Sequence, residues 1–534
     1  MGAKQVEGHV SEDHINTDHP VVSRAELWSY YLFYNGDAGV QNGWIASIVQ
    51  LYQNDARRSP SNGGGACTAD STDCNLPVGG GMPTTTFVLI QQSVTSLFAA
   101  FIFISISGYG DYAMYGRNLL IFFTFLSLIA QAAFMFYRFP GSSADPLPYT
   151  TPMSTVWFHF FLQGVQQIAY SGSLVYFFAL FPRLAPAMPE VRAAIERGDS
   201  EESIYNEIAF QRSRISMIST LWSNIGYFVP AVLTFGLIFA ANPTANILAG
   251  DPTSLVTNNW ILLFLISYWL VFALPWIVLN KPRPGPPVPK DVNIAALGYR
   301  EFGHAVKLWR RLPQAWLYII GFFFFADGNA TMGILVGNLQ NNFVSFNTLT
   351  NNLYTFAQAG TSVLGCIVFW WVGNHFKVPT KRMFQVTNLV ALLVSIWGVV
   401  GIWAPGIGYK TAIEFYIENS LLGFFQAPFW AYQNTYLSDL IPPSKAYLFF
   451  SVFGICGRFS AAIGPLISAL ITAVVPANNT NGAPQSTWIA FIPTTIFMFI
   501  GFVIIQMTNP EKAKRDVIAF EEAEAAEAKA KASA

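Results

Sequence analysis

The stretch Lys281-Pro-Arg-Pro-Gly-Pro-Pro-Val-Pro-Lys290 separates two groups of long apolar segments near the middle of the sequence. Its prolines are typical of a stiff, polyproline-like spacer. Each apolar segment holds about 20 residues, enough for a helix to cross a hydrocarbon core of about 30 Å. The predicted spans, six before the spacer and six after it, are 27–52, 85–107, 118–137, 153–181, 214–240, 259–279, 314–338, 350–372, 383–404, 411–433, 447–475 and 487–508.

These spans predict an all-α membrane protein with twelve transmembrane helices in two six-helix halves. Backbone polar groups must be satisfied inside a bilayer, which favours helices here because the alternating segments of a barrel are absent from the sequence. Of the 534 residues only 11% are charged, against about 25% in soluble domains, which excludes a soluble protein, a nucleic-acid binder and a disordered scaffold. We divide the chain into an N-terminal tail 1–26, a first half 27–280, a linker 281–313, a second half 314–508 and a C-terminal tail 509–534.

The positions of the basic residues predict how the chain is oriented in the membrane. With a cytosolic N-terminus, 24 of the 29 Lys and Arg residues fall on the cytosolic side and four on the opposite side. The positive-inside rule strongly favours this orientation, in which both termini are cytosolic. Arg458 is the one remaining basic residue, and it lies inside a predicted span.

Two loops on the predicted non-cytosolic side carry residues open to modification. Cys67 and Cys74 lie seven positions apart in the first of these loops, where an oxidising compartment would allow a disulfide that spacing alone does not establish. Asn478 begins a glycosylation sequon in the last such loop. No cluster of His or Cys with metal-ligand spacing is present, and we expect neither a metal nor a cofactor.

The first spans of the two halves contain a weak repeat of each other. Tyr34-Asn35-Gly36-Asp37-Ala38-Gly39 corresponds to Phe325-Ala326-Asp327-Gly328-Asn329-Ala330, with an Asp beside Gly near the middle of each span. Parallel six-helix halves with ligand groups near the midplane are typical of major facilitator transporters. The sequence therefore resembles that superfamily, and the resemblance implies the major facilitator fold.

The loop after the second span, Gly108-Tyr109-Gly110-Asp111-Tyr112-Ala113-Met114-Tyr115-Gly116-Arg117, resembles the cytosolic signature of the same superfamily. An Asp here could accept hydrogen bonds at a helix N-terminus and pair with a basic residue. Asp111 and Arg117 are therefore candidates for a cytosolic gate. The alternative is a short turn whose charges only set the topology.

Ionisable side chains at bilayer depth cost about 2.5–3.5 kcal/mol each on insertion scales, so those present need an explanation. Asp37 and Asp327 could bind a proton or a substrate amine, or could be structural carboxyls that bond to neighbouring helices. Arg458 could pair with an Asp, hold a substrate carboxylate or extend to the cytosolic face. Glu418 remains ambiguous, and Gln163 belongs to a polar helix face that could line a cavity or join two helices.

Several motifs together resemble the vacuole effluxer family of autophagy-related protein 22 within the major facilitator superfamily. The best match runs from Leu440-Ile441-Pro442-Pro443-Ser444-Lys445 through Phe449-Phe450-Ser451-Val452-Phe453-Gly454 and Gly457-Arg458-Phe459-Ser460 to Gly464-Pro465-Leu466. Arg458 stands where Lys is commoner in that family. The resemblance implies a multi-pass fungal vacuolar membrane protein, in contact with lipid, that exports amino acids to the cytosol after autophagic breakdown. Protons could serve as the coupling ion.

Other functions remain open on the sequence alone. A major facilitator transporter of another small organic solute or secondary metabolite would share every feature above. A nutrient sensor that does not transport usually needs a large cytosolic extension, whereas the two tails here have about 26 residues each. No phosphate-binding Gly loop or nucleophile elbow lies in or near a span, so we do not expect an enzyme.

Overall fold

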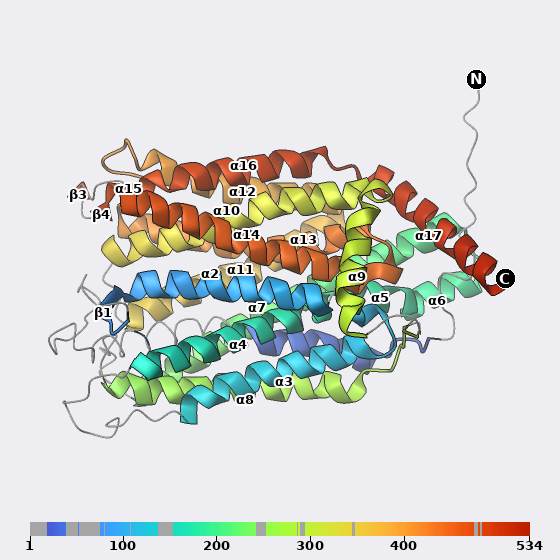
Figure 1. The fold of residues 1–534 in the computed structure, drawn as a ribbon, viewed down its shortest axis with the longest axis horizontal. Helices are drawn as coiled ribbons and strands as arrows, with labels where there is room; N and C mark the ends of the chain where they lie inside the picture. The colour runs from blue at the N-terminus through green and yellow to red at the C-terminus, as the bar shows by residue number, and fades with distance from the viewer. Residues whose placement is uncertain are drawn as a thin grey trace.

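The computed structural model is a bundle of long helices that run side by side along one axis (Figure 1). The structure describes residues 19–38, 52, 75–78, 81–106, 108–136, 153–241, 252–285, 287–288, 294–343, 348–474, 479–480 and 483–533. Cys67, Cys74 and Asn478 lie outside the described residues, so the disulfide and the glycosylation site stay predictions.

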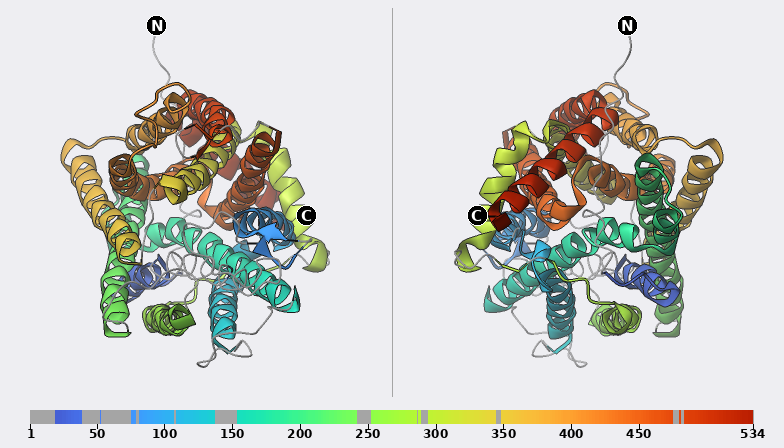
Figure 2. Two further views of the ribbon diagram at one scale, coloured as in Figure 1. Left: turned by 90° about the vertical axis from the view of Figure 1, so that its left-hand side faces the viewer. Right: turned by 90° about the vertical axis from the view of Figure 1, so that its right-hand side faces the viewer.

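The long helices form two groups, one from each half of the sequence. The first group comprises a helix over residues 24–38, α2 (Thr84–Ile106), α3 (Tyr115–Phe136), α4 (Met153–Phe178), α7 (Glu201–Ala241) and α8 (Pro252–Leu279). The second group comprises α10 (Pro313–Phe343), α11 (Thr348–Phe376), α12 (Thr380–Val400), α13 (Ala412–Leu440), α14 (Ala446–Val474) and α16 (Phe491–Met507). Viewed along the bundle axis, the blue-to-green helices and the yellow-to-red helices occupy opposite sides (Figure 2). We call these groups the first half and the second half.

The predicted membrane-spanning character is confirmed for most of these helices. Ten helices in the described part of the chain are long and apolar enough to cross a membrane. The helix over 24–38 and α13 lie where the spans 27–52 and 411–433 are predicted, although α13 carries the acidic residues Glu414, Glu418 and Asp439. The all-helical character is therefore shown, and the count of twelve stays a prediction.

Shorter elements mark the two ends of the bundle, which we call the α9 end and the β1 end (Figure 1). The α9 end carries η3 (Tyr109–Asp111), α5 (Phe181–Leu184), η4 (Ala185–Ala187), α6 (Pro189–Glu196), α9 (Ile294–Lys307), η5 (Leu308–Arg310), η6 (Pro443–Lys445) and the 24-residue helix α17 (Pro510–Ser533). The β1 end carries two hairpins, β1 (Asn75–Leu76) with β2 (Met82–Pro83) and β3 (Asn479–Thr480) with β4 (Ala483–Pro484), together with α15 (Gln485–Ile489). The predicted topology makes the α9 end cytosolic.

The proline-rich spacer packs back against the start of the first half. Arg283 donates from both terminal nitrogens to the carboxylate of Glu26, over 2.6 and 2.9 Å, and both side chains are buried. The Lys281 backbone N–H donates to the same carboxylate. The linker then forms α9, which lies across the bundle (Figure 1). The Tyr299 hydroxyl of α9 forms a hydrogen bond of 2.8 Å with the Ser105 hydroxyl of α2. The spacer and α9 thus pack against the first half at the α9 end.

Candidate functional site

A cavity of about 650 Å³ lies at the centre of the bundle, between the two halves. The first half lines it from the 24–38 helix, α2, α4 and α7, and the second half from α10, α11, α13 and α14. Most of the polar lining consists of amides and hydroxyls, among them Gln92, Asn224, Asn329, Gln358, Gln426 and Asn434. This volume is within the range of small-molecule sites in proteins.

Arg458 is the single charged side chain among the described residues that line the cavity. It projects from the middle of α14, and no hydrogen bond or ion pair joins it to another described residue. No Asp or Glu belongs to the described lining. Within the described lining the positive charge of Arg458 is therefore uncompensated, and it favours an anionic group, for which guanidinium offers two parallel donors.

Asp37 lies beside the cavity without lining it. Its side chain is 0% exposed, and neither carboxylate oxygen has a hydrogen-bond partner among the described residues. Its neighbours along the helix, Tyr34 and Ala38, do line the cavity.

Asp327, the counterpart of Asp37 in the second half, has a different environment. Its Oδ1 accepts a hydrogen bond of 2.8 Å from the backbone N–H of Gly464 on α14, and its side chain is 1% exposed. It lines a narrow crevice with Thr331 and Thr494, at the junction of α10, α14 and α16, and not the central cavity. This geometry favours the structural alternative for Asp327, in which the carboxyl joins two helices.

The Asp327 junction requires glycine at position 464. A Cβ atom added to Gly464 would collide with the Thr331 hydroxyl and would meet both carboxylate oxygens of Asp327 within 3.1 Å. We expect Gly464→Ala to destabilise the protein by about 1–3 kcal/mol, as overpacking typically does. Thermal unfolding of the purified protein measures the change. Gly457→Ala on the same helix is the control, since a Cβ there meets nothing within 4 Å, and an equal loss of stability in both variants would contradict the prediction.

The structure places Glu418 and Gln163 away from the cavity lining. Glu418 is buried where α13 packs on α11, and its Oε2 accepts a hydrogen bond of 3.5 Å from the Tyr354 hydroxyl. Gln163 is buried on α4. One turn further along α4, Gln167 donates to Gln92, a residue that does line the cavity, over 2.8 Å. Through this described contact between Gln167 and Gln92, the polar face of α4 joins α4 to α2.

The cavity is closed toward the α9 end by contacts between the two halves. Asp111 of the first half accepts hydrogen bonds from the backbone N–H groups of Tyr447 and Leu448, over 3.1 and 2.9 Å, and so caps the first turn of α14. The guanidinium of Arg183 lies 5.1 Å from the centre of the Tyr447 ring. A carboxylate at a helix N-terminus is stabilised by the exposed N–H groups and by the helix dipole.

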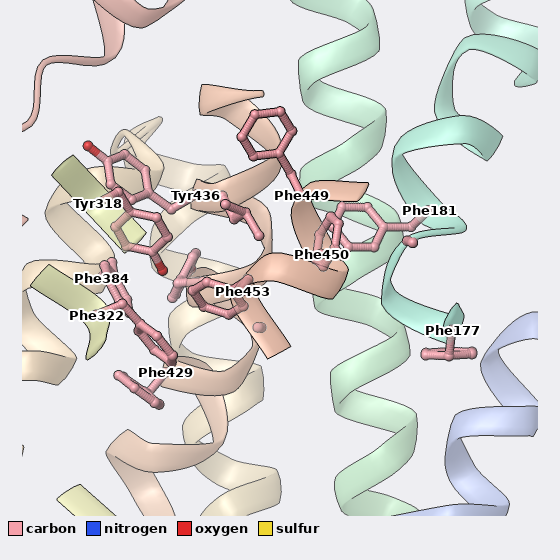
Figure 3. Close-up of a cluster of buried hydrophobic side chains, with 14 of the residues drawn as sticks. Phe177, Phe181, Tyr318, Phe322, Phe384, Phe429, Tyr436, Phe449, Phe450 and Phe453 are labelled. Atoms are coloured by element: carbon pink, nitrogen blue, oxygen red, sulfur yellow. The ribbon is translucent and has the colours of Figure 1, made fainter. Parts of the chain in front are cut away.

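A layer of aromatic rings lies next to this cap (Figure 3). Phe181 of α5 meets Phe450 of α14 edge to face, with ring centres 6.0 Å apart, and Figure 3 shows this pair bridging the two halves. The rings of Phe453 and Phe322 lie with their centres 4.2 Å apart and their planes tilted by 31°, and both residues line the cavity. The aromatic layer therefore separates the cavity from the α9 end.

Arg117, the second residue of the predicted gate, makes a contact inside its own half. Its guanidinium donates to the backbone carbonyl of Ile277 on α8, over 3.0 Å. Besides Asp111, two basic residues make contacts between the halves at the α9 end, Arg183 and Arg212, which the sequence alone did not single out. Arg212 donates to the carbonyl of Ser438 over 2.6 Å and lies 3.9 Å from the carboxylate of Asp439. The clustering of basic residues before the fifth span is the only sequence signal for them.

The C-terminal tail forms a helix, α17, that packs against α13 and α10 at the α9 end. The Lys514 ammonium lies 4.5 Å from the ring centre of Tyr205, a residue of α7 in the first half. Arg212 contacts the same ring at 6.0 Å. Burial raises the pKa of Glu521 on α17 to about 7, although the nearby charge of Arg212 opposes the rise. The tail therefore touches both halves beside the closure.

A bundle of membrane-spanning helices with a polar cavity between two halves, closed at one end, defines a membrane transporter. The solved structures show which fold this is. The major facilitator superfamily transporter FucP, in its outward conformation, aligns with a TM-score of 0.53 and 12% identity over 91% of this chain and 98% of FucP. The chain belongs to the vacuole effluxer Atg22-like family, whose model matches residues 22–518.

Individual relatives are distant in sequence. Autophagy-related protein 22 of Coccidioides immitis is 22% identical over 441 residues, which cover 73% of this chain and 68% of that protein. Autophagy-related protein 22-1 of Sclerotinia sclerotiorum is 22% identical over 56% of this chain, and the match spans about half, 51%, of that relative. These findings confirm the family predicted from the motifs, and the family and the fold are those of transporters.

Proposed function

We propose that this protein exports amino acids from the vacuole to the cytosol by alternating access, and that Arg458 holds the substrate carboxylate. The observation that carries the proposal is the position of Arg458, which is the single charge in the described lining of a central cavity between two halves. A planar guanidinium binds a carboxylate through two parallel hydrogen bonds. The description of the family as vacuole effluxers supports the direction and the compartment.

The remaining lining residues suit the rest of an amino acid. The rings of Phe322, Phe429 and Trp430 provide apolar surface for a side chain. Amide oxygens and aromatic ring faces can hold an α-ammonium group without a full negative charge. The cationic side chain of a bound lysine or arginine would have no carboxylate partner in the described lining, and Arg458 would repel it.

Alternating access requires the closure at the α9 end to open and the β1 end to close in turn. The Asp111 cap and the aromatic layer keep the described conformation closed on the predicted cytosolic side. We infer that a solute reaches the cavity from the vacuolar side in this conformation. Its release to the cytosol would require the first turn of α14 to separate from Asp111.

Counterflow in proteoliposomes tests the proposal. We expect labelled leucine to exchange at least about tenfold faster than labelled lysine, because a second positive charge in the cavity is unfavourable. Protein-free liposomes give the background rate. Equal exchange of leucine and lysine would contradict the assigned role of Arg458, and no exchange of any amino acid would contradict the proposed substrate.

A second candidate substrate is an organic acid that lacks an amine. It is favoured by the absence of Asp and Glu from the described cavity lining, since nothing there neutralises an ammonium. Labelled 4-methylpentanoate, which is leucine without its amino group, distinguishes the two. Faster exchange of 4-methylpentanoate than of leucine would favour the organic-acid transporter.

A further inference from the structure

A second, smaller pocket of about 40 Å³ lies at the α9 end, apart from the central cavity. Its walls come from the turn that leads from η3 into α3, from α5, from the start of the proline-rich spacer and from Tyr447 of α14. Four of its lining residues are cations, namely Arg117, Arg183, Lys281 and Arg283. No Asp or Glu belongs to its described lining. Convergent cations in a concave site favour an anionic ligand.

Two of the four cations are compensated by carboxylates. The guanidinium of Arg283 is joined through both terminal nitrogens to Glu26. The guanidinium of Arg183 interacts electrostatically with the carboxylate of Asp111. Both carboxylates are buried, and neither belongs to the lining of the pocket. They therefore hold these two guanidinium groups in place without filling the pocket.

The other two cations, Arg117 and Lys281, have no carboxylate partner among the described residues. Each donates to a backbone carbonyl over 3.0 Å, Arg117 to that of Ile277 and Lys281 to that of Val21. The Nε atoms of Arg117 and Arg283 are buried and have no hydrogen-bond partner in the described part of the chain. A buried donor of this kind is unfavourable until an acceptor binds it. The pocket thus has two positive charges and two donors that the protein itself leaves unused.

A histidine beside the pocket reports the positive potential there. Burial lowers the pKa of His19, and a backbone hydrogen bond with Pro284 opposes this shift. The charges of three arginines lower the pKa further, in decreasing order Arg183, Arg283 and Arg192. One imidazole therefore interacts with two of the pocket cations, which places these cations close enough to act on a single ligand.

The volume of the pocket limits the size of the anion. A cavity of about 40 Å³ has room for about three water-sized atoms, at about 10–15 Å³ for each. The three terminal oxygens of a phosphate monoester fit this volume, whereas a sugar ring does not. A phosphate monoester carries a charge of about −1.5 to −2 near pH 7, which matches the two uncompensated cations. Arginine side chains also suit the geometry of phosphate oxygens.

The end of α8 provides apolar surface for the rest of a lipid. Val278 and Leu279 are 75% and 45% exposed, and they directly precede Asn280 and Lys281 of the pocket lining. Exposed apolar side chains on a membrane-spanning helix contact lipid acyl chains. The predicted topology places this pocket on the cytosolic side, where the leaflet carries anionic lipids and basic pockets between helices bind their headgroups.

We propose that this pocket binds a phosphate monoester, carried by an anionic lipid of the phosphatidic acid type, to which Arg117 and Lys281 donate. Tyr447 completes the wall from the second half, so the phosphate lies between the two halves in the described conformation. The site is separate from the cavity assigned to the solute. It therefore does not depend on which solute the protein transports.

The test measures ligand binding to the purified full-length protein in detergent, through the rise in unfolding temperature with ligand concentration. Dioctanoyl phosphatidic acid should bind at least about tenfold more tightly than dioctanoyl phosphatidylglycerol, whose phosphate is a diester with a single charge. Lys281→Gln should bind phosphatidic acid about tenfold more weakly than wild type, and Lys281→Arg within about threefold of it. Lys512→Gln, which removes an exposed lysine of α17 at the same end, is the matched control and should bind like wild type.

Soluble probes identify the source of the phosphate. Inorganic phosphate and glycerol 3-phosphate that bind at least about tenfold more weakly than phosphatidic acid would support a lipid, and equal binding would support a soluble phosphate ester in the same pocket. Equal affinity for the two lipids, or no binding of any phosphate by wild type, would overturn the site. Arg117→Gln repeats the comparison at the second uncompensated cation, so a poorly folded Lys281→Gln does not decide the result. Phosphatidic acid affinity equal to wild type in a folded variant of either residue would also overturn the site.

Discussion

Replacement of Arg458 by alanine is expected to reduce leucine exchange about 100-fold. Hydrogen bonds to charged groups contribute about 1.5–3 kcal/mol each, and a bidentate contact with a carboxylate has two of them. A loss of about 3 kcal/mol corresponds to about 100-fold in affinity. Counterflow of labelled leucine, normalised to the amount of reconstituted protein, measures the effect.

Arg458→Lys separates charge from geometry in the same experiment. Lysine keeps the positive charge on a flexible stem but cannot offer the planar pair of donors, so we expect a loss of about tenfold. Arg458→Gln should behave like the alanine variant, because the charge is gone. Wild-type exchange by Arg458→Ala, at normal stability, would show that the solute does not use this side chain.

Replacement of Asp111 by alanine is expected to shift the protein toward a conformation that is open at the α9 end. The substitution removes two hydrogen bonds between a carboxylate and backbone N–H groups, together worth about 3 kcal/mol. The equilibrium between closed and open conformations should therefore change by about 100-fold. Asp111→Asn keeps an acceptor oxygen without the charge and should give a smaller shift.

Distance measurements between spin labels report this change. Labels are placed at two exposed positions of the α9 end, Glu196 on α6, which follows α4 of the first half, and Lys512 on α17, which follows α16 of the second half. The native cysteines of the labelled chain are replaced by serine. We expect the Asp111→Ala distribution to gain a longer distance. Arg117→Gln is the control, because Arg117 bonds to Ile277 of its own half. The same distribution in wild type and Asp111→Ala would show that the cap does not hold the closure.

The sequence predicts the helices well because a span in a bilayer is a local property. Runs of apolar residues and the basic residues between them are sufficient to locate most of the long helices. Helix boundaries that depend on contacts with neighbouring helices are harder to predict from the sequence. The span predicted over 214–240 begins at Glu201 in the structure, since α7 continues from the α9 end into the bundle without a break.

The candidate site depends on contacts that the sequence cannot show. Asp37 and Asp327 look equivalent in their local motifs, yet the donor that satisfies Asp327 belongs to Gly464, 137 residues away. Arg458 is visible in the sequence as an unusual charge, whereas the absence of a carboxylate partner becomes visible only once the described cavity lining is known. The roles of Arg183 and Arg212 likewise come from tertiary contacts with α14 and α13.

The cap on α14 also has a consequence for biogenesis. Asp111 precedes Tyr447 by 336 residues, so the acceptor for the first turn of α14 is synthesised long before the helix that needs it. A second half inserted without its partner would present these N–H groups unpaired at the membrane surface, where quality control can recognise an unassembled chain. The two hydrogen bonds from the first turn of α14 to Asp111 thus form only when the two halves have docked correctly.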